Sequence, residues 1–174
     1  MAQAGEKEDR DAKIRALYRE HRQSVGRQLA VLTRDPASVD DLVNETFIRA
    51  FQSFDRFRGD ASVRTWLHGI ALNVGRNHLA KRRRRDAVEL PPLTGPCATP
   101  EDTLREQRAM QRFHQALDAL PEPMREAFVL RYVQQLPLKD VARLLGVPTS
   151  TAHARASRAE QHLRTSVEGD GEHV

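Results

Sequence analysis

The sequence LKDVARLLGVPTSTAHARASRAEQHLR, residues 138–164, has the spacing of a helix-turn-helix. Its first helix is predicted to bury an apolar stripe formed by Val141, Ala142 and Leu145. Gly146 follows at the point where the chain must turn with a positive φ. Pro148 then sets the backbone for a second helix that begins near Thr149.

The second helix of this motif is predicted to be a DNA-recognition helix. Its N-terminus offers hydroxyl groups and free backbone N–H groups, which favour a phosphate, and basic side chains follow within reach of a groove. The candidate contacts are Thr149, Ser150, Thr151, His153, Arg155 and Arg158. An ordinary αα-hairpin with a solvated basic face would show the same pattern.

The composition predicts an all-α protein. Aromatic residues make up only 5% of the 174 residues, and the segments between Pro and Gly breaks are rich in helix formers, so strands are not expected. No run of 18 apolar residues occurs and the N-terminal stretch is polar, so we expect neither a membrane span nor a signal peptide, and a cytoplasmic location. The single cysteine, Cys97, has no disulfide partner and no zinc-site spacing, and we assign it no role.

Positive charge is concentrated in one part of the chain. Residues 51–85 contain nine Lys or Arg against two acids, whereas the whole chain carries a net charge of only +4. Of the 28 basic residues 24 are Arg, which favours bidentate contacts with phosphate. The expected counterpart is therefore the phosphodiester backbone of a nucleic acid.

The sequence divides into two helical blocks joined by a Pro-rich linker. The linker, DAVELPPLTGPCATP, carries four prolines and a glycine and has no apolar periodicity. The predicted division is a polar N-terminal tail over 1–10, a first helical domain over 11–85, the linker over 86–100, a second helical domain over 101–165 and a flexible C-terminal tail over 166–174.

Apolar spacing predicts three helices in the first block, over about 14–34, 38–54 and 62–85. Asp35-Pro36 ends the first helix, and Ser38 with Asp41 has the spacing of a capping box at the start of the second. The RFRGD stretch, residues 56–60, is expected to be a loop, after which Ser62 can cap the third helix. The second block is predicted to add helices over about 101–120 and 122–133.

Three stretches resemble a bacterial sigma factor of the extracytoplasmic-function (ECF) group. They are DDLVNETFIRAF (40–51), FRGDASVRTWLHGIALN (57–73) and LPEPMREAFVLRYVQQLPLKDVARLLGVPTSTAHARASRAEQHL (120–163), in the family's order and spacing. The resemblance covers the chain from about Ile14 to Leu163. It implies a region 2 helical bundle and a region 4 helix-turn-helix, which bind core RNA polymerase, recognise two promoter elements and open the DNA. It also implies that the chain is not an enzyme and uses no cofactor, metal or small-molecule substrate.

The resemblance implies a polymerase-docking surface on the helix over residues 40–51. This helix resembles the family segment that docks on the clamp helices of the largest polymerase subunit, while region 4 is expected to meet the polymerase flap. The implied contacts are Asp41, Asn44, Glu45 and Arg49. These polar residues fall on the side of the helix away from its apolar stripe, where a plain solvated face would look the same.

Residues 57–62 resemble the loop that takes a flipped base from the non-template strand of the minus-ten promoter element. Phe57 would stack on that base or form one side of its pocket, and Asn73 would form hydrogen bonds with its Watson–Crick edge. Stacking is worth about 1–3 kcal/mol, comparable to the cost of unpairing one base, so the strands can open without ATP. The other implied contacts are Arg58, Gly59, Asp60, Arg64, Trp66 and Arg76, with Trp66 equally interpretable as a core residue.

The helix implied to recognise the minus-thirty-five element differs in sequence from the usual pattern of the family. The chain has STAHAR, residues 150–155, where the family commonly has GTVKSR. The DNA sequence that this helix prefers at the minus-thirty-five element is therefore not predicted. Arg155 and Arg158 are the best candidates for base or phosphate contacts.

The two alternatives to a sigma factor are a free-standing helix-turn-helix regulator and an enzyme. A free-standing helix-turn-helix regulator would use the first block for dimerisation or sensing, but such a domain does not need the charge excess beside the glycine loop. An enzyme finds little support, since the histidines are scattered and no phosphate-binding loop or nucleophile elbow occurs. The resemblance further implies an anti-sigma factor, which in this family is often membrane-bound and would then hold the chain at the inner membrane.

Overall fold

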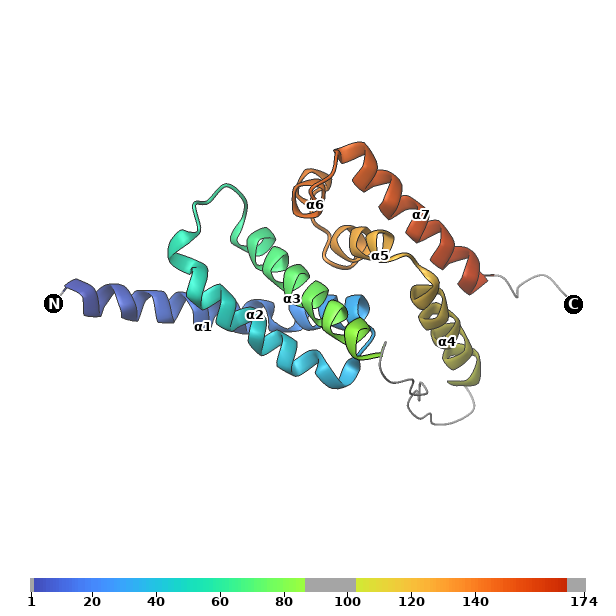
Figure 1. The fold of residues 1–174 in the computed structure, drawn as a ribbon, viewed down its shortest axis with the longest axis horizontal. Coiled ribbons are helices and arrows are strands. Elements are labelled where there is room, and N and C mark those ends of the chain that lie inside the picture. Colours follow the sequence, from blue (N-terminus) through green and yellow to red (C-terminus); the bar gives the residue numbers. More distant parts are fainter. Residues whose placement is uncertain (1, 87–102, 169–174) are drawn as a thin grey trace, which may run out of the picture.

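A computed structural model describes residues 2–86 and 103–168, and over these ranges the chain is helical and contains no strand. Figure 1 shows two groups of helices side by side. The first group contains α1 (Ala2–Thr33), η1 (Pro36–Ser38), α2 (Val39–Ser53), η2 (Phe54–Arg56) and α3 (Val63–Asp86). The second contains α4 (Thr103–Ala119), α5 (Glu122–Phe128), the π-helical turn η3 (Val129–Val133), α6 (Leu138–Leu145) and α7 (Thr149–Glu168). The predicted all-α fold is confirmed.

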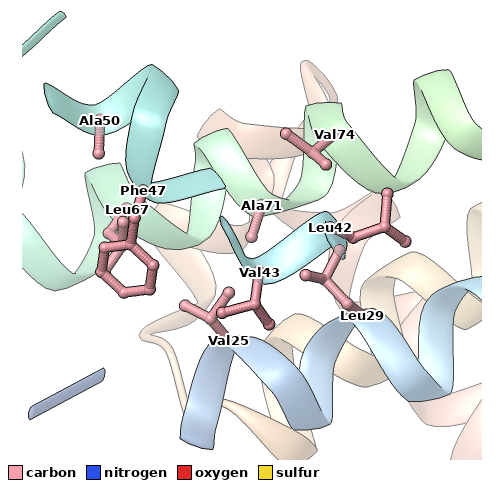
Figure 2. Packing of buried hydrophobic residues seen from close by; sticks show 9 residues of the cluster. All are labelled: Val25, Leu29, Leu42, Val43, Phe47, Ala50, Leu67, Ala71 and Val74. Carbon is pink, nitrogen blue, oxygen red and sulfur yellow. The ribbon is translucent and has the colours of Figure 1, made fainter. Parts of the chain in front are cut away.

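The first group is a bundle in which α1, α2 and α3 share one apolar core. Each helix presents apolar side chains to the centre, as Figure 2 shows. The core consists of Val25, Leu29, Leu42, Val43, Phe47, Ala50, Leu67, Ala71 and Val74. Tyr18 adds an edge-on contact with the Phe47 ring, with the ring centroids 4.8 Å apart. Burial of these apolar surfaces holds the three helices together.

The helix ends agree with the sequence at some positions and differ at others. Ser62 caps α3 as predicted, because its Oγ accepts a hydrogen bond from the Thr65 backbone N–H at 3.0 Å. The capping box predicted at Ser38 is wrong, because its hydroxyl donates instead to Asp35 Oδ2 at 2.8 Å. The first helix begins at Ala2, inside the stretch assigned to a polar tail, since that stretch is rich in good helix formers.

The helix-turn-helix forms as the sequence indicated. Gly146 follows α6 with φ of 67°, and the Val147 N–H donates to the Ala142 carbonyl at 3.1 Å, which closes the C-terminus of α6. The second helix, α7, buries a stripe of small and branched residues, namely Ala152, Ala156, Ala159 and Leu163. The side of α7 opposite this buried stripe therefore faces solvent.

The two groups of helices pack directly on each other, which the sequence did not indicate. Leu32 of α1 and Leu72 of α3 belong to the same apolar cluster as Leu130, Leu136 and Val141 of the second group. Gly69 lets α6 come close to α3, because a Cβ at this position would lie 2.7 Å from Leu144 Cδ2. The two blocks therefore share a buried interface.

Candidate nucleic-acid interface

The helix α3 presents three different sides, because successive residues turn by about 100° around its axis. One side packs into the first core through Leu67, Ala71 and Val74. A second side faces the second group of helices through Thr65, Gly69, Leu72 and Arg76. The third side contains the half-buried Trp66 and the exposed Asn73 and Asn77. This third side is the part of α3 available to a ligand.

The loop in front of α3 places an aromatic group at the end of this open side. Phe57 packs its ring against Trp66 with centroids 5.2 Å apart, and Phe54 contacts Trp66 at 6.0 Å. Gly59 has φ of 77°, and the neighbouring Arg58 is exposed. Trp66 also packs against the core of the first group, and this packing holds in place the ring that Phe57 contacts.

Phe57 and Asn73 lie toward the two ends of this open side of α3. Asn73 lies seven residues after Trp66, which places it on the same side of α3 about 10 Å further along the axis. Asn77, one turn beyond Asn73, is also exposed on this side and was missed by the sequence analysis. The i, i+4 spacing of the two asparagines was the available signal. We refer to Phe57, Trp66, Asn73 and Asn77 as the α3 strip.

Two of the predicted DNA contacts lie elsewhere and have protein partners. Arg64 Nη2 donates to the Gln134 carbonyl at 2.5 Å. Arg76 donates through Nε and Nη2 to the two carboxylate oxygens of Glu126, at 2.5 and 2.7 Å. These hydrogen bonds raise the pKa of Arg76 above its ordinary value. Both arginines therefore bind the second group of helices in this structure.

The C-terminal end of α3 carries a dense positive charge. Lys81, Arg84 and Arg85 are exposed, and Arg83 pairs with Glu122 at 2.5 Å. Cations at the end of a helix also interact favourably with its dipole. This end of α3 is suited to bind a phosphate backbone near the α3 strip.

The predicted polymerase-docking residues share an exposed face of α2. Asp41 and Asn44 are exposed, and Arg49 pairs with Glu45 at 2.6 Å. Ile48 lies among them with 57% of its surface exposed, although large apolar residues are usually buried. Ile48 was not predicted, because an apolar residue in an amphipathic helix is normally assigned to the core. An exposed apolar side chain beside charged neighbours could serve as an anchor for a partner.

The predicted DNA contacts on α7 differ in how exposed they are. Thr149, Ser150, His153 and Arg158 are exposed. Thr151 and Arg155 are half-buried, because they flank the stripe that packs on the rest of the second group. The geometry therefore favours Arg158 over Arg155 for contact with a base edge.

One ionisable side chain is buried between α1 and α3. His68 is 0% exposed, its Nδ1 lies 2.6 Å from Gln28 Oε1, and Gln28 Nε2 donates to the His68 carbonyl. The buried Nε2 has no hydrogen-bond partner among the described residues. Burial, together with the positive charges of Arg64, His21 and Arg27, lowers the pKa of His68 to about 3. The imidazole is therefore neutral near pH 7.

Within the described ranges, no helix combines the length and the apolar character needed to cross a bilayer.

Comparison with known proteins accounts for both groups of helices. Residues 17–85 match Sigma-70 region 2, and residues 110–163 match Sigma-70 region 4. The ECF RNA polymerase sigma-E factor of Escherichia coli K12 is 31% identical over 141 residues, which cover 75% of this chain and 74% of the relative. The RNA polymerase sigma-H factor of Pseudomonas aeruginosa is 33% identical over 141 residues, covering 74% and 72%.

A region 2 bundle followed by a region 4 helix-turn-helix defines the class of sigma-70 initiation factors. The chain belongs to the ECF group of this family.

Solved structures show the same fold. The sigma factor RpoE, in complex with the anti-sigma factor NepR from Bartonella quintana, matches with a TM-score of 0.75 and 22% identity over 91% of this chain and 98% of that chain. CnrH, in complex with the cytosolic domain of CnrY, matches with a TM-score of 0.68 and 24% identity over 92% and 91%.

Proposed function

We propose that this chain is an alternative sigma factor, which directs core RNA polymerase to a particular set of promoters and helps to open the minus-ten element. The observation that carries the proposal is the α3 strip, where an aromatic ring and two exposed amides lie beside a strongly cationic helix end. An unpaired base needs a stacking surface, a partner for its Watson–Crick edge and charge for its backbone. The α3 strip and its surroundings supply all three.

In this proposal the two helical groups divide the work. Region 2, over residues 11–85, would dock on polymerase through α2 and hold the minus-ten strand along α3. Region 4, over residues 101–165, would read duplex DNA at the minus-thirty-five element through α7 and contact the polymerase flap. The chain would act by binding and would itself catalyse no reaction.

Base capture would use the residues of region 2 in distinct roles. A flipped base would stack against Phe57, which Trp66 holds in position. The side-chain amide of Asn73 can both donate and accept a hydrogen bond at the edge of that base. Arg58, in the exposed loop with Gly59 and Asp60, would contact the flanking phosphates.

Transcription from purified components tests the proposed function. Core polymerase mixed with this chain is expected to start transcripts at new, defined positions, and mapping their 5′ ends would give both promoter elements. The chain alone should bind promoter duplex weakly. A specific footprint without polymerase, combined with unchanged transcript starts, would favour a free-standing helix-turn-helix regulator instead.

The docking face yields a prediction about Ile48. Ile48→Glu is expected to weaken binding to core polymerase about tenfold, because it places a charge at the one large apolar side chain exposed on this part of α2. Titration of labelled protein with core polymerase measures the change. Met110→Glu is the matched control, since Met110 is 56% exposed but lies on α4. Equal losses in both variants would contradict the assigned face.

The recognition helix yields a second prediction. Arg158→Ala is expected to weaken binding to the upstream element about tenfold, since a bidentate contact with guanine is worth about 1–3 kcal/mol. Opening of a template with a pre-melted minus-ten element should be unaffected. Arg164→Ala is the control, because Arg164 is exposed on the same helix but pairs with Glu160 at 3.1 Å. Loss of activity on the pre-melted template would contradict the division of work.

The structural relatives suggest one further partner. RpoE was solved in complex with the anti-sigma factor NepR, and CnrH was solved in complex with the cytosolic domain of CnrY. We propose that this chain likewise binds an anti-sigma factor, and that it works in the cytoplasm with RNA polymerase. Purification from its own cells is expected to recover such a protein together with the chain, and recovery of polymerase alone would count against it.

A further inference from the structure

Arg10 of α1 contacts the end of α2 and the turn that follows it. Its Nη1 donates a hydrogen bond to Asp55 Oδ2 at 2.7 Å, and its guanidinium lies over the Phe51 ring, 4.4 Å from the centroid. Only 27% of the Arg10 side chain is exposed, against 55% for Arg22 further along the same helix. The carboxylate and the ring therefore fix the position of the Arg10 side chain.

Asp55 belongs to η2, the short turn that leads into the loop with Phe57. The Phe57 N–H donates to the Phe54 carbonyl at 3.0 Å, and at Phe57 the backbone becomes extended, with φ of −70° and ψ of 112°. The rings of Phe54 and Phe57 both contact Trp66. The turn is thus attached to α3 through its aromatic neighbours and to α1 through Asp55.

A turn of three residues depends on its neighbours for its orientation. The hydrogen bonds of such a short turn have poor geometry, and η2 buries none of its residues. Beyond Phe57, the Asp60 carbonyl accepts a hydrogen bond from Arg143 of the second group at 3.0 Å, which attaches the far end of the loop. The direction in which the chain enters the loop is therefore set by the contacts of Phe54 and Asp55.

The contacts of Arg10 orient this turn and leave little of its guanidinium for a DNA phosphate. One face of the guanidinium lies against Phe51, and Nη1 is taken by Asp55. Its Nε is buried and has no hydrogen-bond partner among the described residues. Because the Asp55 side chain is 67% exposed, the ion pair is expected to add little to the stability of the fold.

We propose that Arg10 is a positioning residue for base capture, which holds the turn η2 through Asp55 and thereby fixes the Phe57 ring against Trp66 before DNA binds. The inference rests on the proposed function of region 2. A loop that is already ordered loses less conformational freedom when the base binds, so more of the stacking energy contributes to strand opening. The start of α1, assigned from the sequence to a polar tail, then assists opening without touching the DNA.

Two single substitutions and their combination test the link between Arg10 and Asp55. Arg10→Ala removes a positive charge and Asp55→Ala removes a negative one, so purely electrostatic effects on DNA binding would have opposite signs. Positioning instead predicts that each variant slows promoter opening about fivefold, because the loop must then be ordered as the base binds. The double variant should be no slower than either single variant, because both substitutions break the same contact.

Arg22→Ala is the matched control on the same helix. Arg22 lies over the Tyr18 ring, 5.8 Å from the centroid, and 3.8 Å from Asp40 Oδ1 of α2. It therefore also joins a ring and an acid, but it lies about 18 Å further along α1 than Arg10, at about 1.5 Å per residue. Its loss should leave promoter opening unchanged.

Trp66 fluorescence reports the loop directly, since Trp66 is the only tryptophan of the 174 residues. In the full chain without DNA, quenching of Trp66 by acrylamide should become about twofold faster in Arg10→Ala and Asp55→Ala but not in Arg22→Ala. A fluorescent base analogue at the minus-ten element follows opening by the complex with core polymerase. The affinity for core polymerase and the urea midpoint should change little in every variant, which separates positioning from unfolding.

Four results would overturn the proposal. Opposite effects of Arg10→Ala and Asp55→Ala on opening would assign the effect to charge, and additive losses in the double variant would show that the two residues act independently. Unchanged quenching would show that Arg10 does not hold the loop. A large fall in the urea midpoint together with lost polymerase binding would reduce both residues to a structural role.

Failure of the proposed function is distinguishable from these results. If the wild-type chain opened no promoter with core polymerase, the proposed function would fail. Quenching of Trp66 in the chain without DNA would still show whether Arg10 and Asp55 hold the loop.

Discussion

Asn73→Ala is expected to slow promoter opening by about tenfold while leaving the affinity for core polymerase unchanged. Asn73 is exposed on the α3 strip, two helical turns from the Trp66 that supports Phe57. Loss of its amide removes the donor and the acceptor that would hold the edge of a flipped base, which is worth about 1–3 kcal/mol. A fluorescent base analogue at the minus-ten element measures the opening rate.

The design separates capture of a base from the general integrity of region 2. Gln23→Ala removes a comparable exposed amide from α1 and should have no effect on opening. A template that is already melted at the minus-ten element should recover much of the activity lost in Asn73→Ala. If Asn73→Ala reduced polymerase binding as strongly as opening, the variant would have unfolded region 2, and the assignment of Asn73 would not stand.

Acid is expected to destabilise the folded chain through His68, by about 2 kcal/mol between pH 7 and pH 5. The pKa of His68 is about 3 in the folded chain against an ordinary value of 6.5, so the unfolded chain binds a proton more readily. The contribution of His68 to the free energy of unfolding is therefore complete above pH 6.5, and it is lost as the pH falls from 6.5 toward 3. Protonation would place a charge on a buried Nε2 that has no acceptor among the described residues. Urea unfolding at a series of pH values measures the loss.

A substitution at position 68 isolates this contribution. His68→Asn keeps a donor for Gln28 but does not titrate, so its stability should vary much less between pH 7 and pH 5, whatever its stability at pH 7. His114 also has a pKa below its ordinary value because of burial, and its contribution remains in both proteins. An identical pH dependence in the variant and the wild type would exclude His68 as the cause.

Much of the local structure follows from short-range signals. Gly146 and Pro148 predicted the turn of the helix-turn-helix, because one allows a positive φ and the other presets a helical φ. Ser62 predicted the start of α3 through its hydroxyl, and the hydrogen bond to Thr65 confirms it. At Ser38 the same reasoning failed, because Asp35 offered its hydroxyl a competing acceptor.

Candidate residues were recognisable where chemistry and helical spacing coincide. Phe57 and Asn73 stood out as an aromatic and an amide at the two ends of a motif, and the structure places them on one side of α3. Ile48 was not recognisable, because an apolar residue in an amphipathic helix is normally assigned to the core. Only the packing of α2 on its neighbours shows that Ile48 lies outside the core.

By itself the sequence determined the helices, the turn, the cationic segment and the family, because these depend on neighbours within a few turns or on motifs read in order. The tertiary structure alone decided that the two regions close on each other, and that Arg64 and Arg76 are taken by region 4. Arg76 and Glu126 lie 50 residues apart in the sequence. No periodicity relates such distant residues, and their pairing depends on how the apolar surfaces of Leu32, Leu72 and region 4 fit together in space.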